Sequence, residues 1–204
     1  MRKVVITGLG AVCPIGNTAE EAWENCKNGM SGVGPITLFD ASPFNVQIAA
    51  EVKNFDPTLY MERNEVRRRD LFEQFGTAAA IQALRQSGYE ITEANADRLG
   101  LVVSSSVGGL ATIEEATMIM TEKGPRRVSP FTIPMIMPNG ASGMTGIDIG
   151  ARGPALSVSS ACASGADSIG LAWQLIRGGG IDAALAGCAD HTICGVGVAS
   201  FDRI

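Results

Sequence analysis

A cysteine stands at a junction between two elements in the stretch "SVSSACASGADSIG", residues 157–170. The run before Cys162 is typical of a strand, and the run after it is typical of a helix. A thiol at the N-terminus of a helix meets unpaired N–H groups and the positive end of the helix dipole, which both favour an anion. Because the thiolate is the nucleophilic form of cysteine, this setting would activate Cys162.

Cys162 therefore has two interpretations. In the first, it is a nucleophile on a strand–turn–helix elbow, where small neighbours such as Ala161 and Gly165 leave room for a thioester and a backbone N–H stabilises an oxyanion. In the second, it is a buried structural cysteine in a turn of small residues. The local sequence leaves both interpretations open.

The elements that must position Cys162 alternate in type along the chain. Strand patterns cover residues 3–8, 46–52, 99–106, 153–161 and 181–189, and helix patterns cover residues 17–29, 63–88, 110–120 and 164–180. This alternation predicts an α/β fold with a mainly parallel sheet covered by helices. The helix after Cys162 is apolar on nearly every side, so we expect it to be buried. Residues 124–143, rich in glycine and proline but also apolar, predict a structured excursion rather than a domain boundary.

Composition excludes several classes of protein. The chain has 204 residues, of which 46% are hydrophobic and 18% charged, and this excludes a disordered chain. The net charge of −5 argues against nucleic-acid binding, and no apolar run is long enough to span a membrane. The five cysteines show no zinc-binding spacing, and their odd number favours a reducing cytoplasm. The glycines of "GLGAVCPIG" miss the dinucleotide fingerprint, because Cys13 stands at the third position. We therefore predict no metal and no cofactor.

Several motifs together resemble one family. The stretches "VVITGLGAVCPIG", "SSSVGGL", "GPRRVSPF", "ARGPALSVSSACASGADSIG" and "GGGIDAALAGCADHTICGVGVASF" are similar to those of the β-ketoacyl-[acyl carrier protein] synthases, most closely the elongating type II enzymes. The resemblance covers essentially the whole chain. It implies a thiolase-like layered fold and a condensing reaction. In that reaction, Cys162 accepts an acyl chain as a thioester, which is then condensed with malonyl carried on acyl carrier protein, with loss of CO2.

The same resemblance assigns roles to other residues. Val107 matches an apolar gate at the mouth of the acyl pocket, and Phe201 matches a pocket-wall phenylalanine, although each could be an ordinary core residue. Arg67, Arg68 and Arg69 match a basic patch that meets the acidic carrier protein, although charge runs are usually solvated helix faces. Residues 134–150 match a dimer contact, so a homodimer is expected.

The chain also departs from the family. Family members orient and decarboxylate malonyl with two histidines from their second half, whereas this chain has one histidine, His191, at neither position. We interpret His191 as a structural or surface residue. Since family members are about twice as long, residues 1–204 are expected to be the N-terminal half of a synthase, incomplete as a catalyst. Alternatives are a polyketide-type ketosynthase, a catalytically silent partner subunit, and a thiolase acting on coenzyme A thioesters; Cys162 argues against the second.

Overall fold

The computed structural model describes residues 2–204. Its α-helices are α1 (Ala19–Lys27), α2 (Arg63–Val66), α3 (Leu71–Ser87), α4 (Leu110–Lys123), α5 (Thr132–Ile136), α6 (Gly140–Ile149), α7 (Ser164–Arg177) and α8 (Gly195–Phe201). Its strands are β1 (Val33–Pro35), β2 (Ile48–Ala50), β3 (Leu99–Ser104) and β4 (Ala183–Cys188). Short 3-10 helices are η1 (Pro57–Leu59), η2 (Ala96–Arg98), η3 (Pro125–Arg127) and η4 (Ala161–Ala163).

The parallel pair β3–β4 forms the centre of the molecule. Its register runs from Leu99 opposite Ala183 to Ser104 opposite Cys188. On the other side of β3, Leu101 forms a parallel bridge with Ala155. Three parallel chain segments therefore lie side by side, as the alternation of strands and helices predicts.

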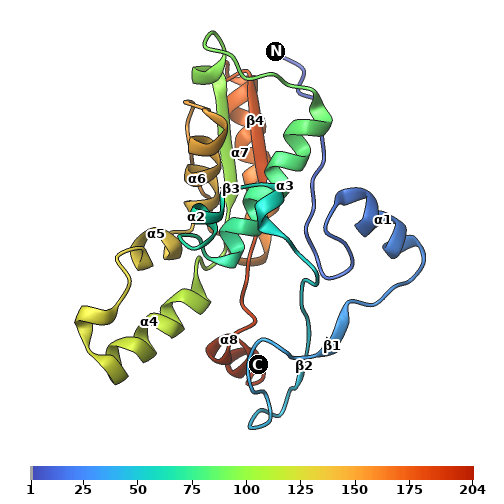
Figure 1. The fold of residues 1–204 in the computed structure, drawn as a ribbon. Coiled ribbons are helices and arrows are strands. Elements are labelled where there is room, and N and C mark those ends of the chain that lie inside the picture. The colour runs from blue at the N-terminus through green and yellow to red at the C-terminus, as the bar shows by residue number, and fades with distance from the viewer. Residues whose placement is uncertain (1) are drawn as a thin grey trace.

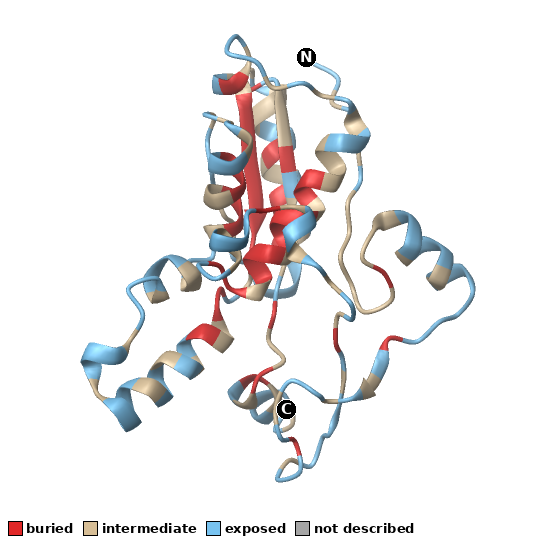
Figure 2. Ribbon diagram, viewed as in Figure 1, coloured by how far each residue is buried: buried red, intermediate tan, exposed pale blue. Residues whose placement is uncertain are grey.

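Helices cover both faces of this pair (Figure 1). Successive side chains of a strand point to opposite faces. Leu101 and Val103 belong to the same core cluster as Phe72 of α3 and Ala141 of α6. Ser104 points the other way, and its Oγ lies 2.6 Å from Oγ of Ser168 on α7. The buried residues concentrate in this layered region, and the β1–β2 pair and the outer helices are more exposed (Figure 2).

Three strand predictions need correction. Residues 3–8 form no strand, and Val5 and Ile6 are exposed, because no strand among the described residues lies beside them to complete the hydrogen bonds. Residues 46–52 yield only β2, which pairs antiparallel with β1 outside the central pair. Residues 153–161 contribute the bridge at Ala155 and no named strand.

The long helix predicted over residues 63–88 is divided in two. Asp70 caps α3, because its Oδ1 accepts a hydrogen bond from Phe72 N at 3.1 Å. Oε2 of Glu73 accepts a hydrogen bond from Asp70 N at 3.0 Å, which completes a capping box. α2 therefore ends at Val66 and α3 starts at Leu71. The predicted stop is confirmed, since Gly88 has φ +65°.

The excursion at residues 124–143 is structured, as predicted. It contains η3, α5 and the start of α6. α4 packs against both η3 and α5, and it also contacts α8.

The burial predicted for the helix after Cys162 is only partial among the described residues, which leave one face of it exposed. α7 buries only Ser164, Ser168 and Ala172, which form one stripe toward β3 and β4. Ile169 and Trp173 are 53% and 42% exposed. The described residues cover α7 from one side only, so its apolar composition is not matched by burial.

Candidate active site

The chain makes a strained turn at the candidate nucleophile. Ala161 has φ +53°, in the left-handed region that residues with a Cβ rarely adopt. The side chain of Ser164 holds this turn, because its Oγ accepts a hydrogen bond from Ser160 N at 2.9 Å and donates one to Ala161 O at 2.7 Å. Cys162 follows Ala161 in η4 and is exposed. The sharp turn therefore presents the Cys162 thiol at the start of α7, as an elbow would.

Two other thiols lie in settings that oppose ionisation. Partial desolvation of the thiol raises the pKa of Cys188 to about 11, and the nearby Asp190 carboxylate acts in the same direction. Burial also raises the pKa of Cys194 to about 11, with Glu114 adding to the effect. At neutral pH these two cysteines are thiols, which are poor nucleophiles.

The turn that carries Val107 lies against the segment that leads to Cys162. Oγ of Ser159 lies 2.9 Å from Ser106 O and 3.3 Å from Ser105 O, and it donates to this pair of carbonyls. Val107 itself is 49% exposed. The predicted gate residue and the predicted nucleophile thus belong to segments in direct contact, at the carboxyl ends of β3 and of the Ala155 segment.

Phe201 lies on α8 and is 68% exposed. It lines a small pocket of about 250 Å3 whose walls come from the β2 region, from the loop before α8 and from α8 itself. The lining residues are Val46, Ile48, Thr192, Ile193, Val198, Phe201 and Asp202. Val107 is not among them, so the described residues do not bring the two predicted acyl-chain contacts into one pocket.

The three arginines predicted as one patch have different environments. Arg67 and Arg68 are exposed, and the Arg68 guanidinium lies 4.9 Å from the centre of the Phe131 ring. Arg69 is only 2% exposed, and its two terminal nitrogens lie 2.6 and 2.7 Å from the carboxylate oxygens of Asp148 on α6. The prediction that Arg69 docks a partner is therefore wrong, because a buried bidentate ion pair occupies its side chain.

Of the two interpretations of His191, a structural residue or a surface residue, its burial favours the first. It is 9% exposed, packs edge-on against Phe75, and has no hydrogen-bond partner for either ring nitrogen among the described residues. Burial lowers the pKa of His191, although the charges of Asp70 and Glu51 oppose the shift. The imidazole is therefore neutral at physiological pH.

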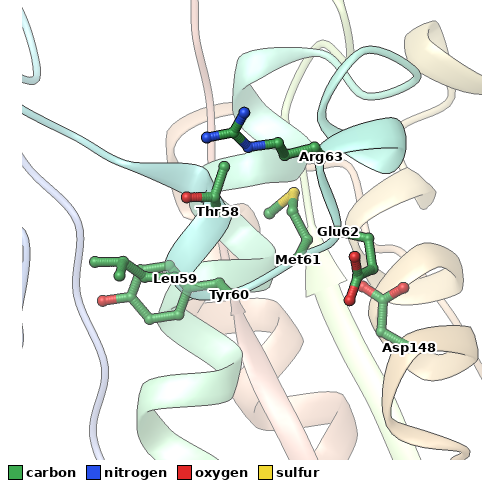
Figure 3. A pocket seen from close by; sticks show the side chains of 7 residues that line it. All are labelled: Thr58, Leu59, Tyr60, Met61, Glu62, Arg63 and Asp148. Atoms are coloured by element: carbon green, nitrogen blue, oxygen red, sulfur yellow. The ribbon is translucent and has the colours of Figure 1, made fainter.

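A larger hollow lies on another part of the surface. Figure 3 shows the seven residues around this open pocket of about 580 Å3, which are Thr58, Leu59, Tyr60, Met61, Glu62, Arg63 and Asp148. None of the predicted site residues lines it.

Within residues 2–204, no group of three or more His, Cys, Asp or Glu side chains could hold a metal ion. The helices of this range are too short or too polar to cross a membrane.

Sequence reasoning missed Asp190. Its Oδ1 accepts hydrogen bonds from Ser105 Oγ at 2.7 Å and from Ser106 N at 2.9 Å, so it anchors the turn that carries Val107. The one available signal was its position directly after a predicted strand, where side chains gather at the carboxyl edge of a parallel sheet.

The chain is similar to one family of known proteins over its whole length. The family model described as "Beta-ketoacyl synthase, N-terminal domain" matches residues 1–204. The chain is 41% identical over 200 residues to the 3-oxoacyl-[acyl-carrier-protein] synthase 2 of Staphylococcus aureus (strain COL), and 44% identical over 200 residues to that of Vibrio harveyi. Each alignment covers 98% of this chain and 48% of the relative. The chain therefore spans about half the length of these curated relatives.

Solved structures agree with this grouping. The ishigamide ketosynthase/chain length factor matches with a TM-score of 0.88 and 30% identity, over 99% of this chain and 50% of the solved one. A β-ketoacyl synthase from Burkholderia phymatum STM815 matches with a TM-score of 0.85 and 29% identity, over 100% and 50% of the two chains. The predicted thiolase-like α/β fold is confirmed. The chain belongs to the β-ketoacyl synthase family and corresponds to the N-terminal domain of that family.

Proposed function

We propose that this chain supplies the acyl-accepting half of a condensing enzyme of fatty-acid-type synthesis. The observation that carries the proposal is the exposed Cys162 thiol, which follows the left-handed Ala161 at the start of α7. The raised pKa values of Cys188 and Cys194 argue against those two thiols as the nucleophile, because a thiolate is disfavoured at both positions. The name of the relatives, 3-oxoacyl-[acyl-carrier-protein] synthase 2, describes an enzyme of this kind and supports the proposal.

The reaction begins with acyl transfer. The Cys162 thiolate attacks the carbonyl carbon of an acyl thioester, the new C–S bond forms, and the thiolate of the donor leaves. A malonyl thioester then loses CO2, and the electron pair of the broken C–C bond attacks the carbonyl carbon of the Cys162 thioester. A new C–C bond forms, the C–S bond breaks, and Cys162 returns to its thiolate form.

We assign only the first of these two steps, acyl transfer to Cys162, to residues 1–204. His191 is buried and neutral, so we assign it no part in decarboxylation. The family resemblance places the two histidines of that step in a second half. We therefore propose that residues 1–204 act as an N-terminal domain whose exposed α7 residues, Ile169 and Trp173, are covered by that half.

The proposed carrier of the acyl and malonyl groups is an acidic acyl carrier protein. Arg67 and Arg68 are exposed beside α2 and offer it a basic surface, whereas Arg69 does not.

We further propose that the enzyme is a homodimer formed around residues 134–150. The five free cysteines favour a cytoplasmic location. We propose that Val107 and Phe201 contact the acyl chain.

A polyketide-type ketosynthase is the second candidate, because the ishigamide ketosynthase/chain length factor has the same fold at 30% identity. A thiolase acting on coenzyme A thioesters is the third. Acyl donors on carrier protein and on coenzyme A, compared side by side, separate the third candidate from the first two. The length of the product formed from repeated malonyl additions separates the first two.

Acyl-enzyme formation tests the proposed nucleophile. The complete protein is incubated with an acyl-carrier-protein thioester, and the acylated peptide is identified by mass spectrometry. We expect acylation of Cys162, its loss in Cys162→Ala, and its retention in Cys188→Ala, which removes a thiol of the neighbouring strand end. Acylation that persists in Cys162→Ala would refute the assignment.

Charge reversal tests the docking surface. Arg67→Glu/Arg68→Glu should raise KM for carrier-bound acyl donors more than for a small thioester, and added salt should reduce the difference. Lys3→Glu/Lys27→Glu makes the same charge change at exposed positions and should not have this effect. An equal loss with both kinds of donor would contradict docking at Arg67 and Arg68.

A further inference from the structure

The turn around Val107 is closed by one carboxylate from a distant part of the chain. Asp190 lies in the loop after β4, and its Oδ1 accepts hydrogen bonds from Ser105 Oγ at 2.7 Å and Ser106 N at 2.9 Å. Oγ of Ser105 in turn accepts a hydrogen bond from Gly108 N at 2.8 Å. Asp190 thus binds the Ser105 hydroxyl and the Ser106 amide directly, and it is linked through Ser105 to the Gly108 amide on the other side of Val107.

This turn has little room to rearrange while the connection holds. Ser105 is fully buried. Gly108 has φ +72°, and a Cβ at this position would collide with Ile136 O, so only glycine fits there. The Ser159 hydroxyl fastens the same turn to the nucleophile segment through the carbonyls of Ser105 and Ser106. Of the side chains that hold the turn, Asp190 supplies the charged group.

We propose that Asp190 is a positioning residue that fixes the Val107 turn beside Cys162 and thereby sets which acyl chains the site accepts. The inference rests on the proposed function. Hydrogen bonds to an ionised carboxylate are stronger than those between neutral groups, so the loss of Asp190 removes the strongest restraint on the turn. Without it, the Ser105 hydroxyl and the Ser106 amide lose their acceptor, and Val107 is free to move away from the acyl chain.

The position of Asp190 also links the turn to the element that carries Phe201. Asp190 lies only five residues before the first residue of α8, and Phe201 is the last residue of that helix. A carboxylate at this point therefore ties together the turn of Val107, the end of β4 and the connection to α8. Cys188, two residues earlier, places its Sγ 3.5 Å from Oδ2 of Asp190, so the second oxygen is also engaged.

The experiment compares Asp190→Ala, Asp190→Asn and the control Asp97→Ala in the complete protein. Asp97 is an exposed carboxylate just before the N-terminal end of β3, whereas the Val107 turn follows its C-terminal end. Hydrogen exchange at the Ser106 and Gly108 amides reports the anchor without any need for activity. In Asp190→Ala we expect exchange at Ser106 to rise about tenfold or more, with a smaller rise in Asp190→Asn, whose side-chain oxygen can still accept both bonds.

The second measurement is acylation of Cys162 with thioester donors of increasing chain length. We expect Asp190→Ala to change the ratio of kcat/KM between long and short donors, with partial recovery in Asp190→Asn and no change in Asp97→Ala. A purely structural defect would lower all donors alike together with the melting temperature, and that result would overturn the inference. Unchanged exchange at Ser106 would also overturn it. Failure of the unmodified protein to acylate Cys162 would overturn the proposed function and the specificity role with it, while the exchange data would still decide whether Asp190 anchors the turn.

Discussion

The burial of Glu73 predicts how the free energy of unfolding depends on pH. Its side chain is fully buried near the start of α3, Oε2 accepts the hydrogen bond from Asp70 N, and Oε1 has no partner among the described residues. Burial raises the pKa of Glu73 from 4.5 to about 8, and the charge of Asp70 acts in the same direction, whereas the hydrogen bond from Asp70 N and the charge of Arg69 oppose it. The carboxyl group is therefore mostly protonated at pH 7 in the folded protein.

The sign of the effect follows from proton binding. Between pH 4.5 and about 8 the folded protein keeps the Glu73 proton that the unfolded chain releases. The free energy of unfolding therefore falls as pH rises through this window, by about 1.4 kcal/mol per pH unit where the difference is a full proton. Over the whole window, the loss is about 5 kcal/mol, and it stops above pH 8.

Glu73→Gln removes this titration. The amide oxygen can still accept the bond from Asp70 N, and the buried amide NH2 adds a cost of about 1–3 kcal/mol that does not depend on pH. Urea unfolding at pH 5, 6, 7, 8 and 9 should show that the variant gains stability relative to the unmodified protein as pH rises, then levels off above 8. Subtraction of the two curves cancels the other titrating groups. A difference that stays constant across the series would refute a protonated Glu73.

The same buried region supports further tests. Arg69→Met leaves Asp148 without its bidentate partner and should cost about 3 kcal/mol or more in urea unfolding, whereas the double variant with Asp148→Leu should recover most of the loss. An additive loss in the double variant would contradict this. Gly140→Ala should destabilise by about 1–3 kcal/mol, because its Cβ would overlap with Oε1 of the buried Glu73 side chain. Gly143→Ala on the same helix has nothing within 4 Å of its Cβ and should stabilise by up to about 1 kcal/mol, so equal effects would exclude the clash.

Local signals in the sequence were sufficient for the features that depend on neighbouring residues. The small residues around Cys162 and the change from strand to helix pattern predicted the sharp turn, and Ala161 adopts the left-handed conformation there. Gly88 ends α3 as predicted, because a glycine after the last turn relieves the strain of the left-handed cap. Thr18 caps α1 through its bond from Glu21 N at 3.1 Å. Each of these features involves residues within about one helical turn of one another.

Tertiary structure alone decided the features that depend on distant partners. Arg67, Arg68 and Arg69 are identical in type, and only the arrival of Asp148 from α6, 79 positions away, separates the buried one from the exposed two. Asp190 likewise acquires its role from Ser105, 85 positions earlier. The apolar residues 3–8 have the composition of a strand, yet a strand exists only where a second backbone supplies hydrogen bonds. Periodicity and spacing describe what a segment is able to do, and the packing of the whole chain determines which partner it meets.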